Sequence, residues 1–320
     1  MMRTYPFDEL RPTDKLLRAL HQQYRVSPSD TSTLRHADVA RTLAGLETQS
    51  KAVDEGNRLK LRSVGESFEG RTLQLASIGR GPIEVLMWTQ MHGDEATHTA
   101  VVLDLLSALV ASPNAELAGC KLLDKSTLHI LPMLNPDGAE RQTRRSAEEI
   151  DINRDAVDLA TPEARVLHQV VRDVRPAFAF NLHNQRATTP VADTGRVATV
   201  SVMAPPIDSD GTTPPSVVRA KQLALEMFAT AERLLPGHAT KYNADYMPTA
   251  FGEWVQTRGV TTVLLEAGGW PDETAETMVE LHFVVLASAL RAIADDLVEQ
   301  IDASRYEQLP LNGKKNREKR

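Results

Sequence analysis

The sequence predicts one α/β domain, in which helices cover both faces of a mixed, mostly parallel, twisted sheet. Three observations support this fold class: short apolar runs alternate with helix-like stretches, several runs end in glycine or turn residues, and no internal repeat is present. The chain has 320 residues, of which 42% are hydrophobic and 25% are charged, which is typical of a globular protein with a substantial core. The length allows one large domain, and the alternation of elements favours it.

The first elements are expected to be helical. Residues 1–60 form a polar lead-in with apolar residues at helical spacing. Two β-like runs follow at 57–65 and 71–79, and both close with glycine. A short apolar run at 83–90 then leads into a helix-like stretch at 99–110. This change of pattern near residue 60 predicts that the main domain spans 61–305.

The second half of the chain continues the alternation. Strands are expected at 126–134, 176–183 and 261–269, and helices at 216–235 and 277–301. The sequence "NPDG" at 135–138 predicts a turn. Residues 186–215 are rich in Thr, Pro, Gly and Asp, so they are expected to form loops near a site. Residues 306–320 are expected to form a basic, disordered tail.

Charge and cysteine content exclude several classes of protein. The formal net charge is -7 and the pI is about 5.8, which argues against a nucleic-acid-binding protein. The single cysteine, Cys120, excludes an internal disulfide framework and is expected to be a small buried residue. The first residues lack the apolar segment of a signal peptide, and no run approaches the roughly 18 apolar residues that cross a membrane. We therefore expect a cytoplasmic protein without a membrane partner; its oligomeric state is not indicated.

Polar residues follow four of the expected strands. The strand ends read "VLMWTQMHGDE", "LHILPMLNPDG", "AFAFNLHNQ" and "VTTVLLEAGG". Ligands bind outside the carboxyl ends of the strands in open α/β sheets, so these residues are expected to converge on one site. His92 and Glu95 can turn toward one point if a helix begins near Glu95. A catalytic zinc needs three protein ligands and one open position, and His183, at another strand end, fits best as the third.

The pair His92 and Glu95 has other interpretations when it is taken alone. Many helix starts contain H-x-x-E by accident, with Asp94 or Glu95 facing the helix dipole. His98 extends the pattern to H-x-x-E-x-x-H and competes as a ligand, although its side chain would point back along the helix. Residues farther along the chain must therefore show whether His92 and Glu95 are metal ligands.

The ordered set of motifs resembles the zinc carboxypeptidase family of the carboxypeptidase A type, the M14-like metallocarboxypeptidases. The set consists of H-x-x-E, N-P-D-G, R-x-x-R, D-x-N-R, a strand-end His and a strand-end Glu, with "SFEGR" at 67–71 ahead of the first metal strand. The resemblance covers about residues 60–300. It implies a zinc-dependent hydrolase that uses one Zn²⁺ ion to cleave a C-terminal peptide bond, or a related amide bond, of a substrate with a free carboxylate.

The resemblance also implies roles for individual residues. The implied zinc ligands are His92, Glu95 and His183, and the implied general base and acid is Glu266. Arg141 aligns with the arginine that stabilises the oxyanion, but Arg144 and Arg145 are close enough in sequence to leave that assignment open. Asn153 and Arg154, in "DINRD", match the pair that binds the substrate carboxylate, and Asp155 is a candidate partner of Arg154. Spacing back from Glu266 favours Tyr246 as the tyrosine that closes over substrate, with Tyr242 as the other candidate.

Some features depart from this family. The motif "HGDE" is more similar to the corresponding motif of deacylases that act on N-acyl amino acids, such as aspartoacylase-like enzymes, whereas "NPDG" favours peptidases. A deacylase on the same fold and a non-catalytic zinc- or peptide-binding protein therefore remain alternatives, and an amidase acting on cell-wall peptides is a variant of the main interpretation. The base of the substrate pocket is expected near "AFGEW", with Gly252 and Glu253. If Glu253 faces the substrate, basic side chains would be favoured.

Overall fold

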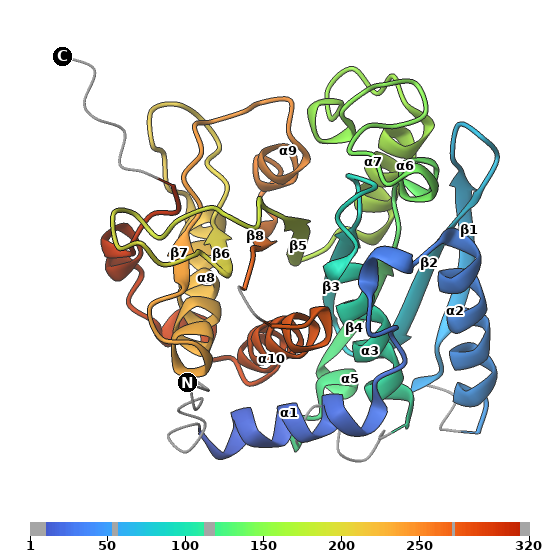
Figure 1. Ribbon diagram of the computed structural model, residues 1–320, viewed down its shortest axis with the longest axis horizontal. Helices are drawn as coiled ribbons and strands as arrows, with labels where there is room; N and C mark the ends of the chain where they lie inside the picture. The colour runs from blue at the N-terminus through green and yellow to red at the C-terminus, as the bar shows by residue number, and fades with distance from the viewer. Residues whose placement is uncertain (1–10, 53–56, 112–118, 271–272, 314–320) are drawn as a thin grey trace.

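The sheet has eight strands in the order β1-β2-β4-β3-β5-β8-β6-β7 (Figure 1). The computed structural model describes residues 11–52, 57–111, 119–270 and 273–313. The strands are β1 (Lys60–Glu66), β2 (Thr72–Gly79), β3 (Ile83–Thr89), β4 (Ser126–Leu131), β5 (Phe178–Asn184), β6 (Val200–Met203), β7 (Ala239–Lys241) and β8 (Thr261–Ala267). The pairs β4–β3, β3–β5, β5–β8 and β6–β7 are parallel. The pairs β1–β2, β2–β4 and β6–β8 are antiparallel.

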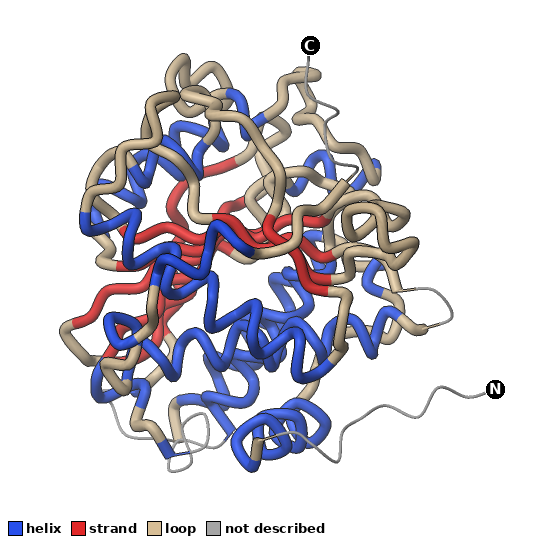
Figure 2. Tube along the Cα trace, turned by 90° about the vertical axis from the view of Figure 1, so that its left-hand side faces the viewer, coloured by secondary structure: helices blue, strands red, loops and turns tan. Residues whose placement is uncertain are grey.

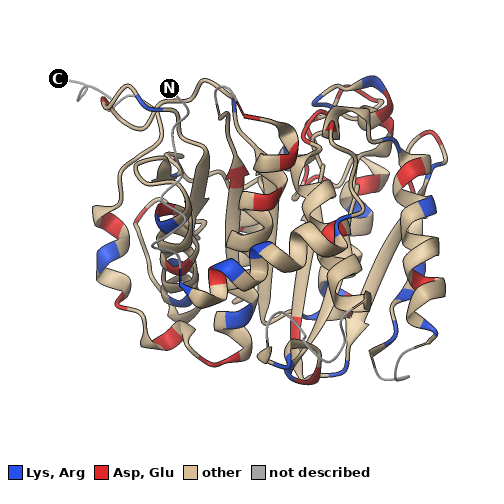
Figure 3. Ribbon diagram, turned by 60° about the horizontal axis from the view of Figure 1, so that its bottom comes forward, with Lys and Arg blue, Asp and Glu red and all other residues tan. Residues whose placement is uncertain are grey.

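Helices surround this sheet. The α-helices are α1 (Pro12–Tyr24), α2 (His36–Ser50), α3 (Thr97–Ala111), α5 (Leu122–Lys125), α6 (Pro136–Arg141), α7 (Pro162–Val174), α8 (Pro215–Leu234), α9 (Phe251–Gln256) and α10 (Ala275–Ala294). Short 3₁₀ helices are η2 (Thr31–Thr33), η4 (Ile152–Arg154), η5 (Val298–Gln300) and η6 (Ala303–Gln308). Basic and acidic residues are interspersed over these elements in the view of Figure 3.

The sheet separates two hydrophobic cores, because neighbouring side chains along a strand point to opposite faces. On β3, Val85 and Met87 belong to one core, whereas Leu86 and Trp88 belong to the other. Residues of α1, α2, α3, α8 and α10 complete the first core, and residues of α7 and α9 complete the second. Figure 2 shows the strands as a layer with helices on both sides. The predicted fold class, a single α/β domain with a mixed sheet, is confirmed.

The N-terminal helices share the first core. Helices α1 and α2 pack against α3, and α1 also packs against α10. The carboxylate of Asp104 on α3 is fully buried and accepts hydrogen bonds from the backbone N–H groups of Val26 and Ser27, at 2.7 and 2.8 Å. His21 on α1 lies 3.0 Å from the same carboxylate. These contacts attach the expected lead-in to the rest of the domain.

Four segments differ from the sequence-based expectation. The described part of the expected disordered tail, 306–313, is ordered, because Tyr306 and Asn312 are buried against the domain. "NPDG" does not form a simple turn, because Pro136 begins helix α6 and Asn135 caps it by accepting a hydrogen bond from the Gly138 N–H at 2.9 Å. The stretch expected to be loops, 186–215, contains β6, which pairs antiparallel with β8. The closing helix is shorter than expected and ends at Ala294.

Helix α10 corrects the expectation that no segment approaches the length needed to cross a membrane. By length and composition alone it meets that requirement, yet 83% of the stretch is buried inside the structure. Its side chains pack mainly against α8, α3 and α1, as in the central helix of a folded domain. Cys120 is also buried, as expected, and burial raises the pKa of its thiol.

Candidate metal centre

The carboxyl ends of three parallel strands bring the candidate residues together. His92 and Glu95 lie in the turn between β3 and α3, and His183 and Glu266 lie near the ends of β5 and β8. Strand β5 pairs with both β3 and β8, and His183 is the register partner of Glu266. The parallel pairing thus places residues that are up to 174 positions apart at one edge of the sheet, which is the arrangement predicted from the sequence.

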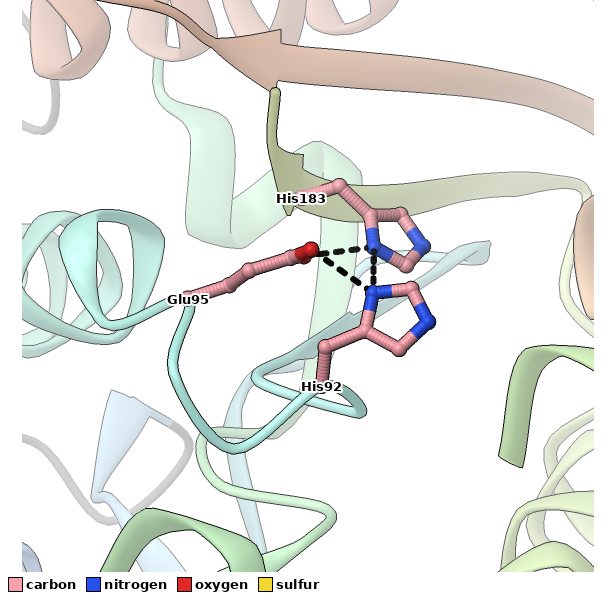
Figure 4. A group of neighbouring side chains, drawn as sticks. All are labelled: His92, Glu95 and His183. Carbon is pink, nitrogen blue, oxygen red and sulfur yellow. Dashed lines mark hydrogen bonds and ion pairs between the residues drawn. The ribbon is translucent and has the colours of Figure 1, made fainter. Parts of the chain in front are cut away.

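His92, Glu95 and His183 form a compact triad (Figure 4). The Nδ1 atom of His92 lies 2.8 Å from Glu95 Oε1, and the Nδ1 atom of His183 lies 2.8 Å from Glu95 Oε2. The two Nδ1 atoms are 3.1 Å apart. All three side chains are buried, so the donor atoms are largely shielded from solvent.

A close approach of two glycines shapes the turn that carries the first two members of the triad. A Cβ atom at Gly93 would lie only 2.1 Å from the carbonyl carbon of Gly138, so any other residue would push this turn away from α6. Gln90 adopts a φ of 50° and donates a hydrogen bond to the Gly93 carbonyl at 2.8 Å. The helix begins at Thr97, so Glu95 precedes it and is free to face His183.

Asp151 fixes the orientation of His92. Its Oδ1 atom lies 3.0 Å from His92 Nε2, so the Nε2–H of that ring donates to the carboxylate and the Nδ1 lone pair faces the triad. The other oxygen, Oδ2, accepts hydrogen bonds from Nε and Nη2 of Arg144, at 3.2 and 3.0 Å. Asp151 is the first residue of the D-x-N-R motif, but the sequence analysis assigned it no role.

Electrostatics favour the protonation state that a metal ligand needs at Glu95 and His183. Burial opposes a charge on Glu95, but its contacts with the imidazole rings of His183 and His92 outweigh burial and hold the pKa of Glu95 well below its ordinary value. Burial lowers the pKa of His183. For His92, burial is outweighed by hydrogen bonds to Asp151 and Glu95, so its pKa is raised. An anionic Glu95 beside a neutral His183 suits a metal cation.

The donor set fits one zinc ion. Two imidazole nitrogens and one carboxylate oxygen lie within 4.8 Å of one another, which is the combination that catalytic zinc sites use when a fourth position stays open. The backbone N–H of Asn184 donates to Glu95 Oε2 at 3.0 Å and holds the carboxylate in place. The predicted cofactor, one Zn²⁺ ion, therefore agrees with the chemistry of these three side chains.

Glu266 stands beside the triad as a buried carboxyl group. Burial raises its pKa well above the ordinary value, and the negative charge of Glu95 raises it further. Its Oε2 atom has no hydrogen-bond partner among the described residues, although it is buried. A carboxyl group whose pKa is raised holds a proton more readily, and this suits the predicted role of general base and acid.

One cavity of about 950 Å³ contains the triad and most of the other predicted residues. It is lined by Glu266, Asn153 and Arg154, among others. Asn153 is held by a hydrogen bond from the Phe251 N–H to its Oδ1, at 3.0 Å, and Arg154 donates to the Asn153 carbonyl at 2.7 Å. The predicted carboxylate-binding pair thus lies in the same cavity as the metal donors.

Arg141 lies outside the cavity, although the resemblance implied a role for it at the oxyanion. Its side chain is 47% exposed, pairs with Glu69, donates to the Asp137 carbonyl at 3.1 Å and does not line the cavity. Arg144 lines the cavity instead, and its Nη1 donates to His92 Nδ1 at 3.1 Å. The reason is the chain path: Arg141 ends α6 on its outer side, and the following loop returns toward the triad.

Buried Asn135 explains why this loop returns. Its Nδ2 donates to the carbonyl groups of Met91, Arg144 and Arg145, at 3.3, 3.4 and 3.1 Å. One side chain of "NPDG" thereby joins the turn of the first metal ligands to the backbone of Arg144. The sequence contained this signal as the N-P-D-G motif, but its use became visible only in three dimensions.

The tyrosine and aspartate predictions also change. Tyr242 lines the cavity and Tyr246 does not, so the choice of Tyr246 by spacing is not supported by the geometry. Burial, with the charges of Glu266 and Glu95, raises the pKa of Tyr242 to about 12, so its hydroxyl stays protonated. Asp155 does not pair with Arg154 in the described structure; it accepts hydrogen bonds from Thr161 and the Ala160 N–H instead.

His98 lies behind the triad rather than in it. Its Nε2 atom is 3.1 Å from Nδ1 of His282, and both rings are fully buried. The two rings meet edge to face with centroids 4.8 Å apart. The expectation that His98 would point away from the strand ends agrees with this contact.

Comparison with known proteins identifies relatives of this chain. The family model described as zinc carboxypeptidase matches residues 48–198. Carboxypeptidase M of Mus musculus is 27% identical over 164 residues, which cover 43% of this chain and 37% of that protein. Carboxypeptidase SOL1 of Arabidopsis thaliana is 28% identical over 140 residues, which cover 39% of this chain and 28% of that protein. The chain therefore matches well under half the length of these curated relatives.

The fold has relatives among solved structures as well. The crystal structure of a metallo-carboxypeptidase from Burkholderia cenocepacia superposes with a TM-score of 0.63 at 18% identity, covering 81% of this chain and 69% of that one. At this identity the likeness supports the fold alone. Together, the family match over residues 48–198 and the curated relatives confirm the resemblance predicted from the ordered motifs: this chain is similar to the zinc carboxypeptidases.

Proposed function

We propose that the protein is a zinc-dependent metallocarboxypeptidase. Its substrate is a peptide, or a related small amide, with a free C-terminal carboxylate. The observation that carries this proposal is that the triad, the buried carboxyl group of Glu266 and two arginines, Arg144 and Arg154, line one cavity. A metal-binding protein without turnover has no need of an unpaired buried carboxyl group beside the donors.

The residues divide the reaction between them. A zinc ion held by the triad would supply Lewis-acid chemistry, which lowers the pKa of water and polarises the scissile carbonyl group. Glu266 takes a proton from the attacking water at its unpaired Oε2 and delivers it to the leaving amine nitrogen as the C–O bond forms and the C–N bond breaks. The guanidinium group of Arg144 stabilises the negative charge that develops on the carbonyl oxygen. Arg154 and Asn153 bind the terminal carboxylate.

The first test is hydrolysis of defined substrates by the zinc-loaded protein, followed by mass spectrometry. Peptides with free and amidated C-termini, cell-wall tripeptides and N-acyl amino acids would be compared. We expect loss of one C-terminal residue from the free peptides only, because amidation removes the carboxylate that the arginine would bind. Cleavage of N-acyl amino acids alone would assign the protein to the deacylases instead.

Arg144 and Arg141 provide a matched pair of variants. Replacing Arg144 by Ala is expected to lower kcat/KM by about 10²- to 10³-fold, the usual effect of removing one donor that stabilises a developing oxyanion. Replacing Arg141 by Ala removes an exposed ion pair with Glu69, so activity is expected to change by less than about threefold. Steady-state kinetics at equal zinc content measure both. A larger loss in the Arg141 variant would restore the assignment made from the sequence.

Glu253 lies in the cavity wall and is proposed to select basic C-terminal side chains. Burial raises the pKa of Glu253 to about 7, against the opposing charge of Arg154, so the group gains its negative charge as the pH rises through neutrality. We expect the preference for Lys-ended over Phe-ended peptides to grow about tenfold between pH 6 and pH 8, because the ionised fraction of a carboxyl group with a pKa of about 7 rises about tenfold over that range.

Two variants test this selection by the ratio of kcat/KM values across that pH range. Glu253→Gln should flatten the ratio. Asp245→Asn removes an exposed carboxylate of the same cavity and should leave the pH dependence in place. A preference for Phe-ended peptides at every pH would contradict the proposal.

The cytoplasmic location expected from the sequence remains a prediction, and localisation of the tagged full-length protein would test it.

A further inference from the structure

The end of the described chain forms part of the cavity. Residues 310–313 lie beside β7 (Figure 1). Asn312 and Gly313 both line the cavity. Backbone bridges pair Leu311 with Lys241 and Asn312 with Val191. This segment therefore lies between two others: the stretch that follows β5 and the loop that follows β7.

The side chain of Asn312 joins these two segments. Its Oδ1 accepts a hydrogen bond from the Asn243 N–H at 2.6 Å, and its Nδ2 donates to Gln185 Oε1 at 2.7 Å. A backbone N–H can only donate, so the bond from Asn243 fixes which end of the Asn312 amide is oxygen. Asn312 is 6% exposed, so both bonds are protected from solvent.

Gln185 connects this amide to the strands of the metal centre. Its Nε2 donates to the Ala198 carbonyl and to Ser201 Oγ, both at 2.8 Å, which leaves its Oε1 facing Asn312. Its backbone N–H donates to the Ala267 carbonyl at 2.8 Å. Gln185 follows His183 by two residues, and Ala267 follows Glu266 directly, so this end of the connection is part of the rigid sheet.

The other end of the connection is a loop. Tyr242 is attached to β6 by one backbone hydrogen bond, from its N–H to the Val202 carbonyl at 2.9 Å. Asn243, Ala244 and Asp245 are exposed and line the cavity. After the hydrogen bond of the Tyr242 N–H, the next hydrogen bond along the loop is the one from the Asn243 N–H to Asn312. This bond therefore holds the backbone directly after Tyr242.

We propose that Asn312 is a positioning residue. It holds the loop formed by residues 242–245, the Tyr242 loop, in place beside the metal centre. This inference rests on the proposed function, since it concerns how the same cavity receives substrate. The metal donors and Glu266 keep their own contacts without Asn312. Its loss therefore affects substrate binding and leaves the chemical step intact.

The test compares three forms of the full-length protein loaded with zinc: wild type, Asn312→Leu and Asn312→Asp. The Leu variant has a similar volume but forms neither side-chain hydrogen bond, whereas the Asp variant keeps the acceptor for Asn243. For Asn312→Leu we expect KM to rise about tenfold with kcat within about twofold, because the loop loses its hydrogen bond from Asn243 to Asn312, and one such bond corresponds to roughly a factor of ten. For Asn312→Asp we expect KM within about threefold of wild type.

Hydrogen exchange gives a readout that does not depend on activity. Amide exchange in the peptide covering 242–247 should accelerate about tenfold in Asn312→Leu and stay near wild type in Asn312→Asp. Thr48→Ala is the control, because the exposed Thr48 hydroxyl donates to the Ala44 carbonyl within α2 and does not line the cavity.

The outcomes separate the two proposals. Unchanged KM and unchanged exchange in Asn312→Leu would overturn the positioning role, as would a fall in kcat and thermal stability with KM unchanged. Should wild type hydrolyse none of the substrates, the proposed function fails while the exchange measurement still decides whether Asn312 holds the loop.

Discussion

Replacing Glu266 by Gln is expected to lower kcat/KM for hydrolysis by up to about 10⁴-fold, the upper range for loss of a general base. Glutamine has nearly the same shape, but its amide has no basic oxygen that can take a proton from water. The zinc donors do not include Glu266, so the variant should bind one zinc ion per chain as wild type does.

The measurement is steady-state kinetics on a free C-terminal peptide, with zinc content determined on the same samples. Glu163→Gln is the matched control. Glu163 is also buried and burial raises its pKa, but it lies in the first turn of α7 and accepts a hydrogen bond from the Phe68 N–H at 3.0 Å, outside the cavity. Its replacement should leave kcat within about threefold, since no reacting group is touched. Near-normal turnover by Glu266→Gln would falsify the assignment of the general base.

The second large effect is expected from the triad. Replacing His183 by Ala removes one of three donors, so zinc affinity should fall by more than about 100-fold, beyond the 10- to 100-fold typical of outer-shell changes. When zinc is limiting, the rate of hydrolysis by the variant should fall together with its zinc affinity. Wild type should also be stabilised against unfolding by zinc, by about 4 kcal/mol at a free concentration a thousand times its Kd, and the variant should gain less than about 1.4 kcal/mol at the same concentration.

Competition with a chelator measures the zinc affinity. Thermal unfolding with and without zinc measures how far zinc stabilises the folded protein. His98→Gln is the control, because His98 was the competing ligand in the sequence and packs against His282 in the structure. We expect it to keep zinc affinity within about tenfold, as for a residue outside the donor set. If His98→Gln lost zinc while His183→Ala retained it, the triad would be the wrong set.

The strands and the site residues that end them could be predicted from local pattern. Apolar runs with turn residues behind them marked β3, β5 and β8, and His183 and Glu266 stood at their ends because a buried strand admits few polar residues elsewhere. His92 and Glu95 followed from the same rule. Each motif was weak alone, and their order along the chain made the resemblance specific.

Loops were less predictable, because their paths depend on contacts that lie far apart in sequence. Arg141 and Arg144 are three residues apart, and only the hydrogen bonds from buried Asn135 to the loop carbonyl groups decide which of them reaches the cavity. The choice between Tyr242 and Tyr246 likewise depends on where the loop after β7 is attached.

By itself, the sequence determined the fold class, the ligand types and the strand ends from which they come, because periodicity and residue chemistry are local properties. Only the tertiary structure decided which arginine and which tyrosine face the triad, that Asp151 orients His92, and that Asn312 closes the cavity wall. The physical reason is that a side chain on a loop is positioned by hydrogen bonds to distant backbone groups, and no spacing in the sequence encodes those partners.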